Sequence, residues 1–123
     1  MQIYGIKNCN TVKKALNFLN EQQIAYTFID FKKQPPAAEQ IRTFLQAVPA
    51  QQLINRRGTT YRRLDDNNRQ KLDKAIEAED VDNIIPYLIQ HSSLIKRPVA
   101  VTANSTTIGF DETIQTRWLQ ATH

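Results

Sequence analysis

The amino-acid sequence predicts an α/β fold in which a small mixed β-sheet is combined with an inserted group of helices. Short apolar segments alternate with segments of helical periodicity over residues 1–49. A polar, helical stretch follows over about residues 50–90, and two further short strands and a helix complete the chain. The length of 123 residues is typical of one domain with its own hydrophobic core.

The beginning of the chain predicts a strand, a helix and a second strand. Residues 2–6 and 24–31 are apolar segments that contain β-branched and aromatic residues, as is typical of strands. Between them, apolar residues recur at helical spacing over residues 12–19. Asn8 or Asn10 is placed to cap this helix at its start.

A second helix is expected after the second strand. Pro35–Pro36 ends the strand and begins the helix, and Pro49 ends it. The apolar stripe of this helix consists of Ile41, Phe44, Leu45 and Val48. An alternation of strand and helix predicts two parallel strands joined by a right-handed crossover.

Residues 50–90 differ from the rest because they are polar and almost wholly helical. We interpret this stretch as a set of short inserted helices with few apolar anchors. These anchors are Leu53, Ile54, Tyr61, Leu64, Leu72, Ile76, Ile84, Ile85, Tyr87, Leu88 and Ile89.

The C-terminal part predicts a β-hairpin and a last helix. Residues 98–101 and 106–108 are short strands, and residues 102–105 form the turn between them. Asp111 is placed to cap the helix, whose inward-facing residues are Ile114, Trp118 and Leu119. The complete order of elements is that of a thioredoxin-like, or glutaredoxin-like, domain with a helical insertion. We therefore expect a single domain over residues 1–123, with its core in residues 1–49 and 91–123.

Composition excludes several other classes of protein. Hydrophobic residues make up 41% of the chain and charged residues 23%, a balance that excludes collagen-like, disordered and coiled-coil proteins. No apolar run reaches the roughly 20 residues that a membrane span requires, and no apolar leader is visible, so we expect a cytoplasmic protein. We also expect the protein to be a monomer. The net charge of +4 weakly favours anionic partners, and nucleic-acid binding is not expected.

Cys9 is the single cysteine of the chain and its main candidate for chemistry. An internal disulfide is excluded, and the other potential metal ligands, His91 and His123, are distant in sequence, so no metal site is expected. Cys9 lies between the end of a strand and the start of a helix, where free backbone N–H groups and the helix dipole stabilise a thiolate. The Thr11 hydroxyl is able to donate a hydrogen bond to the sulfur.

Three blocks of sequence carry a resemblance to a known family. They are residues 4–15, YGIKNCNTVKKA; residues 55–64, NRRGTTYRRL; and residues 94–99, LIKRPV, followed by IGF at 108–110. In this order they resemble the arsenate reductase and Spx-like family, and more narrowly its YffB-like members. The resemblance spans nearly the whole chain.

The resemblance implies a thioredoxin-like fold and a redox role for Cys9. It also implies that Arg97 binds an anion or glutathione beside the thiolate, and that a cis peptide bond precedes Pro98. In this reading Asn10 and Thr11 lie at the same site. The resemblance further implies an arginine of the middle block at the site, and either Arg57 or Arg56 fits that role.

Two departures from the family pattern bear on function. Arsenate reductases of this type have a further arginine in the hairpin region, whereas residues 104–107 here are Asn-Ser-Thr-Thr. Spx regulators have a second cysteine three residues after the first, where this chain has Val12. The first departure weighs against arsenate reduction, and the second excludes an intramolecular disulfide switch.

Two functional hypotheses remain open. The first is a glutathione-dependent reductase of disulfides or oxyanions that uses the Cys9 thiolate, with glutathione as co-substrate, glutaredoxin as a further reductant and no bound cofactor. The second is an Spx-like transcription regulator that binds the C-terminal domain of the RNA polymerase α subunit. Arsenate reduction is a narrower form of the first hypothesis.

Overall fold

The computed structural model describes residues 1–121, and it contains a four-stranded mixed sheet as the sequence predicts. The strands are Gln2–Gly5 (β1), Thr27–Asp30 (β2), Val99–Val101 (β3) and Thr106–Ile108 (β4). They lie in the order β2-β1-β3-β4. β1 pairs in parallel with β2, while β1 with β3 and β3 with β4 are antiparallel. The predicted parallel pair and the predicted hairpin are therefore both present.

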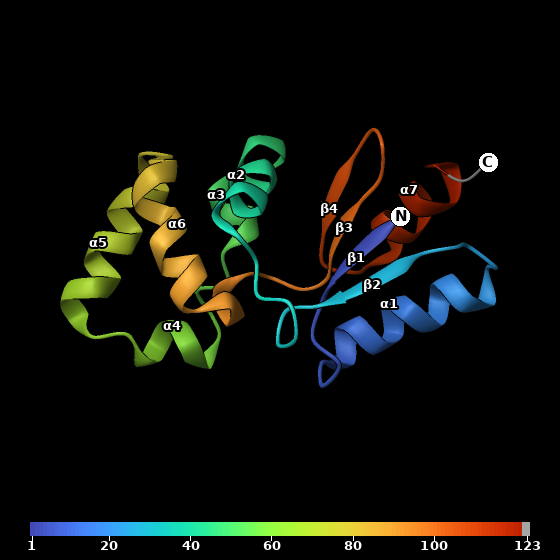
Figure 1. The fold of residues 1–123 in the computed structure, drawn as a ribbon, viewed down its shortest axis with the longest axis horizontal. Helices are drawn as coiled ribbons and strands as arrows, with labels where there is room; N and C mark the ends of the chain where they lie inside the picture. The colour runs from blue at the N-terminus through green and yellow to red at the C-terminus, as the bar shows by residue number, and fades with distance from the viewer. Residues whose placement is uncertain (122–123) are drawn as a thin grey trace. The chain divides into compact units, whose positions relative to one another are not determined.

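The chain forms two compact units, which we describe separately. The first consists of Met1–Gln34 together with residues 97–121, and the second is Pro35–Lys96. The sheet and the helices Asn10–Glu21 (α1) and Glu112–Ala121 (α7) belong to the first unit (Figure 1). The expected helical insert, about residues 50–90, is narrower than this second unit. The second unit also contains the helix that follows Pro35–Pro36.

The core of the first unit lies between one face of the sheet and both of its helices. Ile3 on β1 and Ala100 on β3 are register partners, so their side chains share a face of the sheet. The buried cluster around them includes Leu19 of α1 and Trp118 of α7. Trp118 is 1% exposed, and its indole Nε1–H donates to Thr107 Oγ1 at 3.0 Å. The predicted inward position of Trp118 is confirmed.

Helix α1 begins and ends in ways that the sequence analysis did not anticipate. Cys9 itself is the N-cap residue, so the expected cap by Asn8 or Asn10 is wrong. At the other end Gln23 has a φ of 57°, and the Ile24 N–H donates to the Leu19 carbonyl at 2.9 Å. This is a Schellman termination, in which an apolar residue after the turn packs back on the helix. Ile24 therefore belongs to the helix end, which is why β2 is shorter than expected.

The second unit consists of helices, as its polar periodicity predicts. They are Ala38–Ala47 (α2), Ala50–Leu53 (α3), Thr59–Arg63 (α4), Asp66–Glu77 (α5) and Val81–Gln90 (α6), followed by the 3-10 helix Ser92–Leu94. Figure 1 shows α5 and α6 running side by side. Most predicted anchors are buried or partly buried, but Ile89 is 47% exposed, so its assignment as an inward anchor is wrong.

Other features of the second unit hold its loops in place. Asp65 caps α5 by accepting a hydrogen bond from the Asn68 N–H at 2.8 Å. The Glu79 carboxylate accepts from the Ala50 N–H at the start of α3, at 3.1 Å.

Within residues 1–121 no helix has both the length and the apolar character that a membrane crossing requires.

Candidate active site around Cys9

Cys9 lies in the loop that leads from β1 into α1. Its backbone is extended, with φ of −131° and ψ of 120°, and its carbonyl accepts the first helical hydrogen bond, from the Lys13 N–H at 2.9 Å. The side chain is half-buried and forms no disulfide. A residue at this position faces the unpaired N–H groups of the first helical turn, which is a favourable environment for a negative charge.

Close packing sets the position of the first turn of α1. Gly5 ends β1, and a Cβ built at Gly5 would lie 2.8 Å from Cγ2 of Val12. Val12 is fully buried, so its side chain fills the space that Gly5 leaves open. The absence of a side chain at residue 5 therefore allows α1 to start close against the sheet, with the Val12 N–H beside Cys9.

Sheet pairing brings Arg97 to the same place. Tyr4, near the end of β1, pairs with Val99 at the start of antiparallel β3. The segment just before β3 must therefore lie beside the loop that follows β1. That segment contains Arg97 and Pro98, and the peptide bond between them is cis. The Pro98 carbonyl accepts a hydrogen bond from the Gly109 N–H at 2.8 Å, which ties this segment to the end of the hairpin.

The surroundings of Cys9 lower its pKa below the ordinary value of 9.0. Burial alone raises the pKa of this thiol, but several groups that favour the thiolate outweigh it. They are the backbone N–H of Val12, the Arg97 side chain as a hydrogen-bond donor, the positive charge of Arg97, and the backbone N–H of Thr11. The sulfur makes no geometrically complete capping bond to the helix, so we regard these contacts as electrostatic support rather than a fixed cap.

One polar atom of Arg97 is left without a partner. The Nε–H is buried and has no hydrogen-bond acceptor among the described residues, while the guanidinium also faces Cys9. A buried donor without an acceptor is costly, so it is favourably satisfied by an oxygen that arrives with a ligand. This feature makes Arg97 suited to binding a carboxylate or oxyanion next to the sulfur.

Arg56 and Arg57 lie in the second unit and line a basic pocket of about 500 Å³ there. Lys96 lines it as well, together with Asn55, Gln51 and Ile54. The Arg57 side chain is exposed, and its backbone N–H donates to Asn55 Oδ1 at 3.0 Å. Sequence reasoning missed Lys96, although its position next to Arg97 in the LIKRPV block was a signal for it.

Arg56 differs from Arg57 because it has a carboxylate partner. Its Nη1 lies 3.4 Å from Asp73 Oδ1, and the Tyr61 hydroxyl donates to both oxygens of the same carboxylate, at 2.9 and 2.8 Å. Burial and the Asp73 carboxylate together raise the pKa of Tyr61. Arg56 is therefore held toward α5, whereas the Arg57 guanidinium has no hydrogen bond or ion pair within residues 1–121 and is the freer of the two to meet a ligand.

The structure thus brings together part of the predicted site. Cys9, Arg97 and the first turn of α1 meet within the first unit. Thr11 contributes its backbone N–H and not the expected hydroxyl, and the Asn10 side chain is exposed. Val12 was missed, because an apolar helical residue gives no sign that its backbone N–H faces a sulfur.

No group of three potential metal ligands occurs among residues 1–121. His123, one of the two histidines considered as a ligand, lies outside the described residues. His91 is the C-cap residue that follows α6 in the second unit.

Comparison with known proteins gives relatives over almost the whole chain. An uncharacterised protein of Haemophilus influenzae is 33% identical over 110 residues, covering 89% of this chain and 90% of the relative. The global transcriptional regulator Spx 2 of Bacillus anthracis is 23% identical, with 89% of this chain and 79% of the regulator covered.

Solved structures show the same relationship. A protein called YFFB superimposes with a TM-score of 0.84 at 33% identity, over 98% of this chain and 96% of the other. An arsenate reductase (ArsC) related protein from Brucella melitensis has a TM-score of 0.71 at 37% identity, over 97% and 93% of the two chains. These neighbours confirm the predicted thioredoxin-like α/β fold. The ArsC family model matches residues 4–116, and the chain therefore belongs to the ArsC family.

Proposed function

We propose that this protein is a glutathione-dependent thiol reductase that uses the Cys9 thiolate as its nucleophile. The observation that carries the proposal is the position of Cys9 at the start of α1 beside Arg97. The hydrogen bond and the charge of Arg97 help to lower the pKa of this thiol. A thiolate is the nucleophilic form of cysteine. Membership of the ArsC family, with arsenate reductase-related neighbours, supports an oxidoreductase.

The proposed reaction balances with two molecules of glutathione. The Cys9 thiolate attacks one sulfur of a substrate disulfide, forms a mixed disulfide and releases the other half as a thiolate, which takes up a proton. A glutathione thiolate then releases the second half of the substrate and leaves glutathione bound to Cys9. A second glutathione regenerates the Cys9 thiolate and departs as glutathione disulfide. External thiols are required because the chain has one cysteine.

Arg97 is the proposed anion-binding residue of this site. Its planar guanidinium is suited to hold a carboxylate of glutathione in two hydrogen bonds, and its unpartnered Nε–H supplies a donor for that purpose. Arg57 lines the basic pocket of the second unit without an ion pair among residues 1–121, and its role at the Cys9 site stays a prediction from the family resemblance. An oxyanion such as arsenate is a weaker candidate substrate, since residues 104–107 supply no further arginine.

The test is a glutathione-coupled disulfide reduction assay on the purified full chain. We expect turnover by the wild type, loss of turnover in Cys9→Ser, and full activity in Thr113→Ser, an exposed substitution on α7 that serves as a control. A parallel assay with glutaredoxin in place of excess glutathione tests whether glutaredoxin also reduces the mixed disulfide between Cys9 and glutathione. Equal turnover in wild type and Cys9→Ser would exclude the proposal.

A regulator that binds RNA polymerase is the second candidate. Similarity to the Bacillus anthracis Spx 2 regulator over 89% of this chain favours it. The arginines Arg57, Arg62 and Arg63 are exposed and offer a basic protein-binding surface. A pull-down with the purified C-terminal domain of the polymerase α subunit separates the two hypotheses. Binding that persists in Cys9→Ser supports a transcription regulator, and absence of binding excludes that function.

A further inference from the structure

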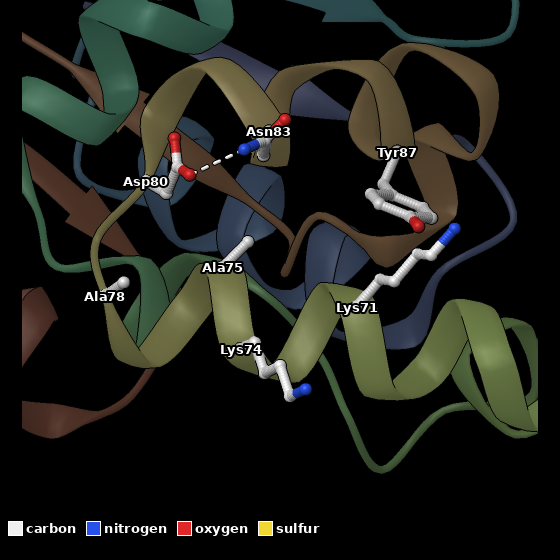
Figure 2. A pocket seen from close by; sticks show the side chains of 7 residues that line it. All are labelled: Lys71, Lys74, Ala75, Ala78, Asp80, Asn83 and Tyr87. Carbon is white, nitrogen blue, oxygen red and sulfur yellow. Dashed lines mark hydrogen bonds between the residues drawn. The ribbon is translucent and has the colours of Figure 1, made fainter.

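Helices α5 and α6 border an open pocket of about 420 Å³ that is separate from Cys9 and from the basic pocket around Arg57 (Figure 2). It lies entirely in the second unit and contains none of the arginines of the basic pocket. Its volume is in the range that small organic ligands occupy in proteins, about 300–1,000 Å³.

The tight connection between the two helices creates this space. Glu79 adopts a φ of 51°, and the Asp80 N–H donates to the Ala75 carbonyl at 2.9 Å, so that α6 starts directly after α5 ends. On the α5 side, the pocket is bordered by the methyl groups of Ala75 and Ala78. Two small side chains opposite the longer Asn83 and Tyr87 of α6 leave the gap unfilled (Figure 2).

The walls combine an aromatic surface with positive charge. The Tyr87 hydroxyl donates to Asn68 Oδ1 at 3.0 Å, which holds the ring in place. The Lys71 side chain extends toward Tyr87, whereas Lys74 points away from α6 (Figure 2). Neither lysine forms an ion pair with a carboxylate in the part of the chain that is described.

Asp80 is the negative group that lines the pocket, and its charge is already engaged. Its carboxylate accepts a hydrogen bond from Asn83 Nδ2 at 2.6 Å. It also lies at the start of α6, where the helix dipole favours a negative charge. Lys71 also has the Asp65 carboxylate as an electrostatic neighbour, since its positive charge helps to lower the pKa of Asp65. The two lysines that line the pocket still outnumber the one carboxylate that lines it.

We propose that this pocket binds a small aromatic carboxylate. The ring of the ligand packs between Tyr87 and the alanine methyl groups, and its carboxylate meets the Lys71 ammonium group, with Lys74 adding positive charge one helical turn further along α5. Apolar walls with a small number of placed charges are the usual composition of such sites. The proposal is independent of the chemistry of Cys9 and concerns a second site on the chain.

The test uses indoleacetate and tryptamine, which share a ring system and carry opposite charges. Each is titrated into the nitrogen-labelled full chain while backbone amide resonances are followed. We expect indoleacetate to shift the amides of Ala75, Ala78, Asn83 and Tyr87 in a saturable manner, and tryptamine to leave them unchanged. Equal binding of tryptamine, or shifts from indoleacetate confined to other residues, would overturn the proposal.

Variants then test the two parts of the site separately. Ala78→Phe fills the pocket from an exposed position and is expected to weaken indoleacetate binding at least tenfold. Lys71→Gln removes one partly solvated charge and is expected to weaken it about threefold. Lys33→Gln makes the same charge change at an exposed position in the first unit and serves as the matched control. Binding unaffected by Ala78→Phe, or weakened equally by Lys33→Gln and Lys71→Gln, would contradict the assignment.

Discussion

Substitution of Gly5 by alanine tests how the start of α1 is held beside Cys9. The new methyl group would lie 2.8 Å from Val12 Cγ2, whereas ordinary carbon contact begins at 3.4 Å. Val12 cannot relieve this overlap easily, because a β-branched residue in a helix has one strongly preferred rotamer and this side chain is fully buried. The first turn of α1 must therefore move away from the sheet.

The expected cost follows from the size of this overlap. Adding a methyl group to a filled core position destabilises a protein by about 1–3 kcal/mol. Val12→Ala, which removes two buried methyl groups, is expected to cost about 2 kcal/mol by itself. In the double variant the new methyl at residue 5 occupies part of the space left at residue 12. The double variant should therefore be more stable than the sum of the two losses predicts, by about 1 kcal/mol or more.

Two measurements check this reasoning. Denaturant unfolding of the wild type, both single variants and the double variant gives the coupling free energy between residues 5 and 12. Thiolate absorbance against pH gives the pKa of Cys9, which should rise in Gly5→Ala, because the Val12 N–H moves away from the sulfur. A coupling free energy near zero, or a Cys9 pKa that is unchanged in a destabilised Gly5→Ala variant, would refute the argument.

Three further predictions concern the first unit. The backbone N–H groups of α1 and the Arg97 side chain lower the Cys9 pKa by more than burial raises it, so the alkylation of Cys9 by iodoacetamide should have its pH midpoint below 9.0. Arg97→Gln should move that midpoint upward more than Arg97→Lys does. Identical midpoints in the wild type and both variants would contradict the role of Arg97. Gln23→Gly should raise the free energy of unfolding by about 0.5–1 kcal/mol, since glycine adopts the positive φ of this helix end without strain, and a measured loss of stability would count against this account. Thr107→Val should lower the free energy of unfolding by about 0.5–1.5 kcal/mol, because it removes the hydrogen bond that the buried indole N–H of Trp118 donates to Thr107 Oγ1. If this hydrogen bond is the cause, Thr107→Val should cost less in a Trp118→Phe background than in the wild type, and an equal cost in both backgrounds would contradict it.

The errors of the sequence interpretation have physical causes. Ile24 has the apolar, β-branched character of a strand residue, but it packs against the end of α1 and β2 begins only at Thr27. Ile89 follows the apolar residues of a short helix, and periodicity over two or three turns does not fix which member faces solvent. Asn8 and Asn10 both have side chains suited to capping, yet the path from β1 places Cys9 at that position.

The site was predicted as far as local sequence carries information. The strand, the helix and the cysteine between them are encoded within residues 2–19, so the position of Cys9 at a helix N-terminus was predictable. The roles of Arg97 and the cis bond before Pro98 entered through family resemblance and not through any local pattern. The contributions of Gly5 and Val12 gave no signal, because a glycine in a strand end and a valine in a helix are ordinary residues there.

The sequence by itself determined the order of strands and helices and the place of its one thiol, because periodicity and backbone preferences act between near neighbours in the chain. Only the tertiary structure decided which charge meets that thiol. Antiparallel pairing of Tyr4 with Val99 brings the segment containing Arg97 beside the loop after β1. Contacts between residues so far apart in sequence depend on sheet register, and register is set by the packing of the whole sheet face rather than by any short segment.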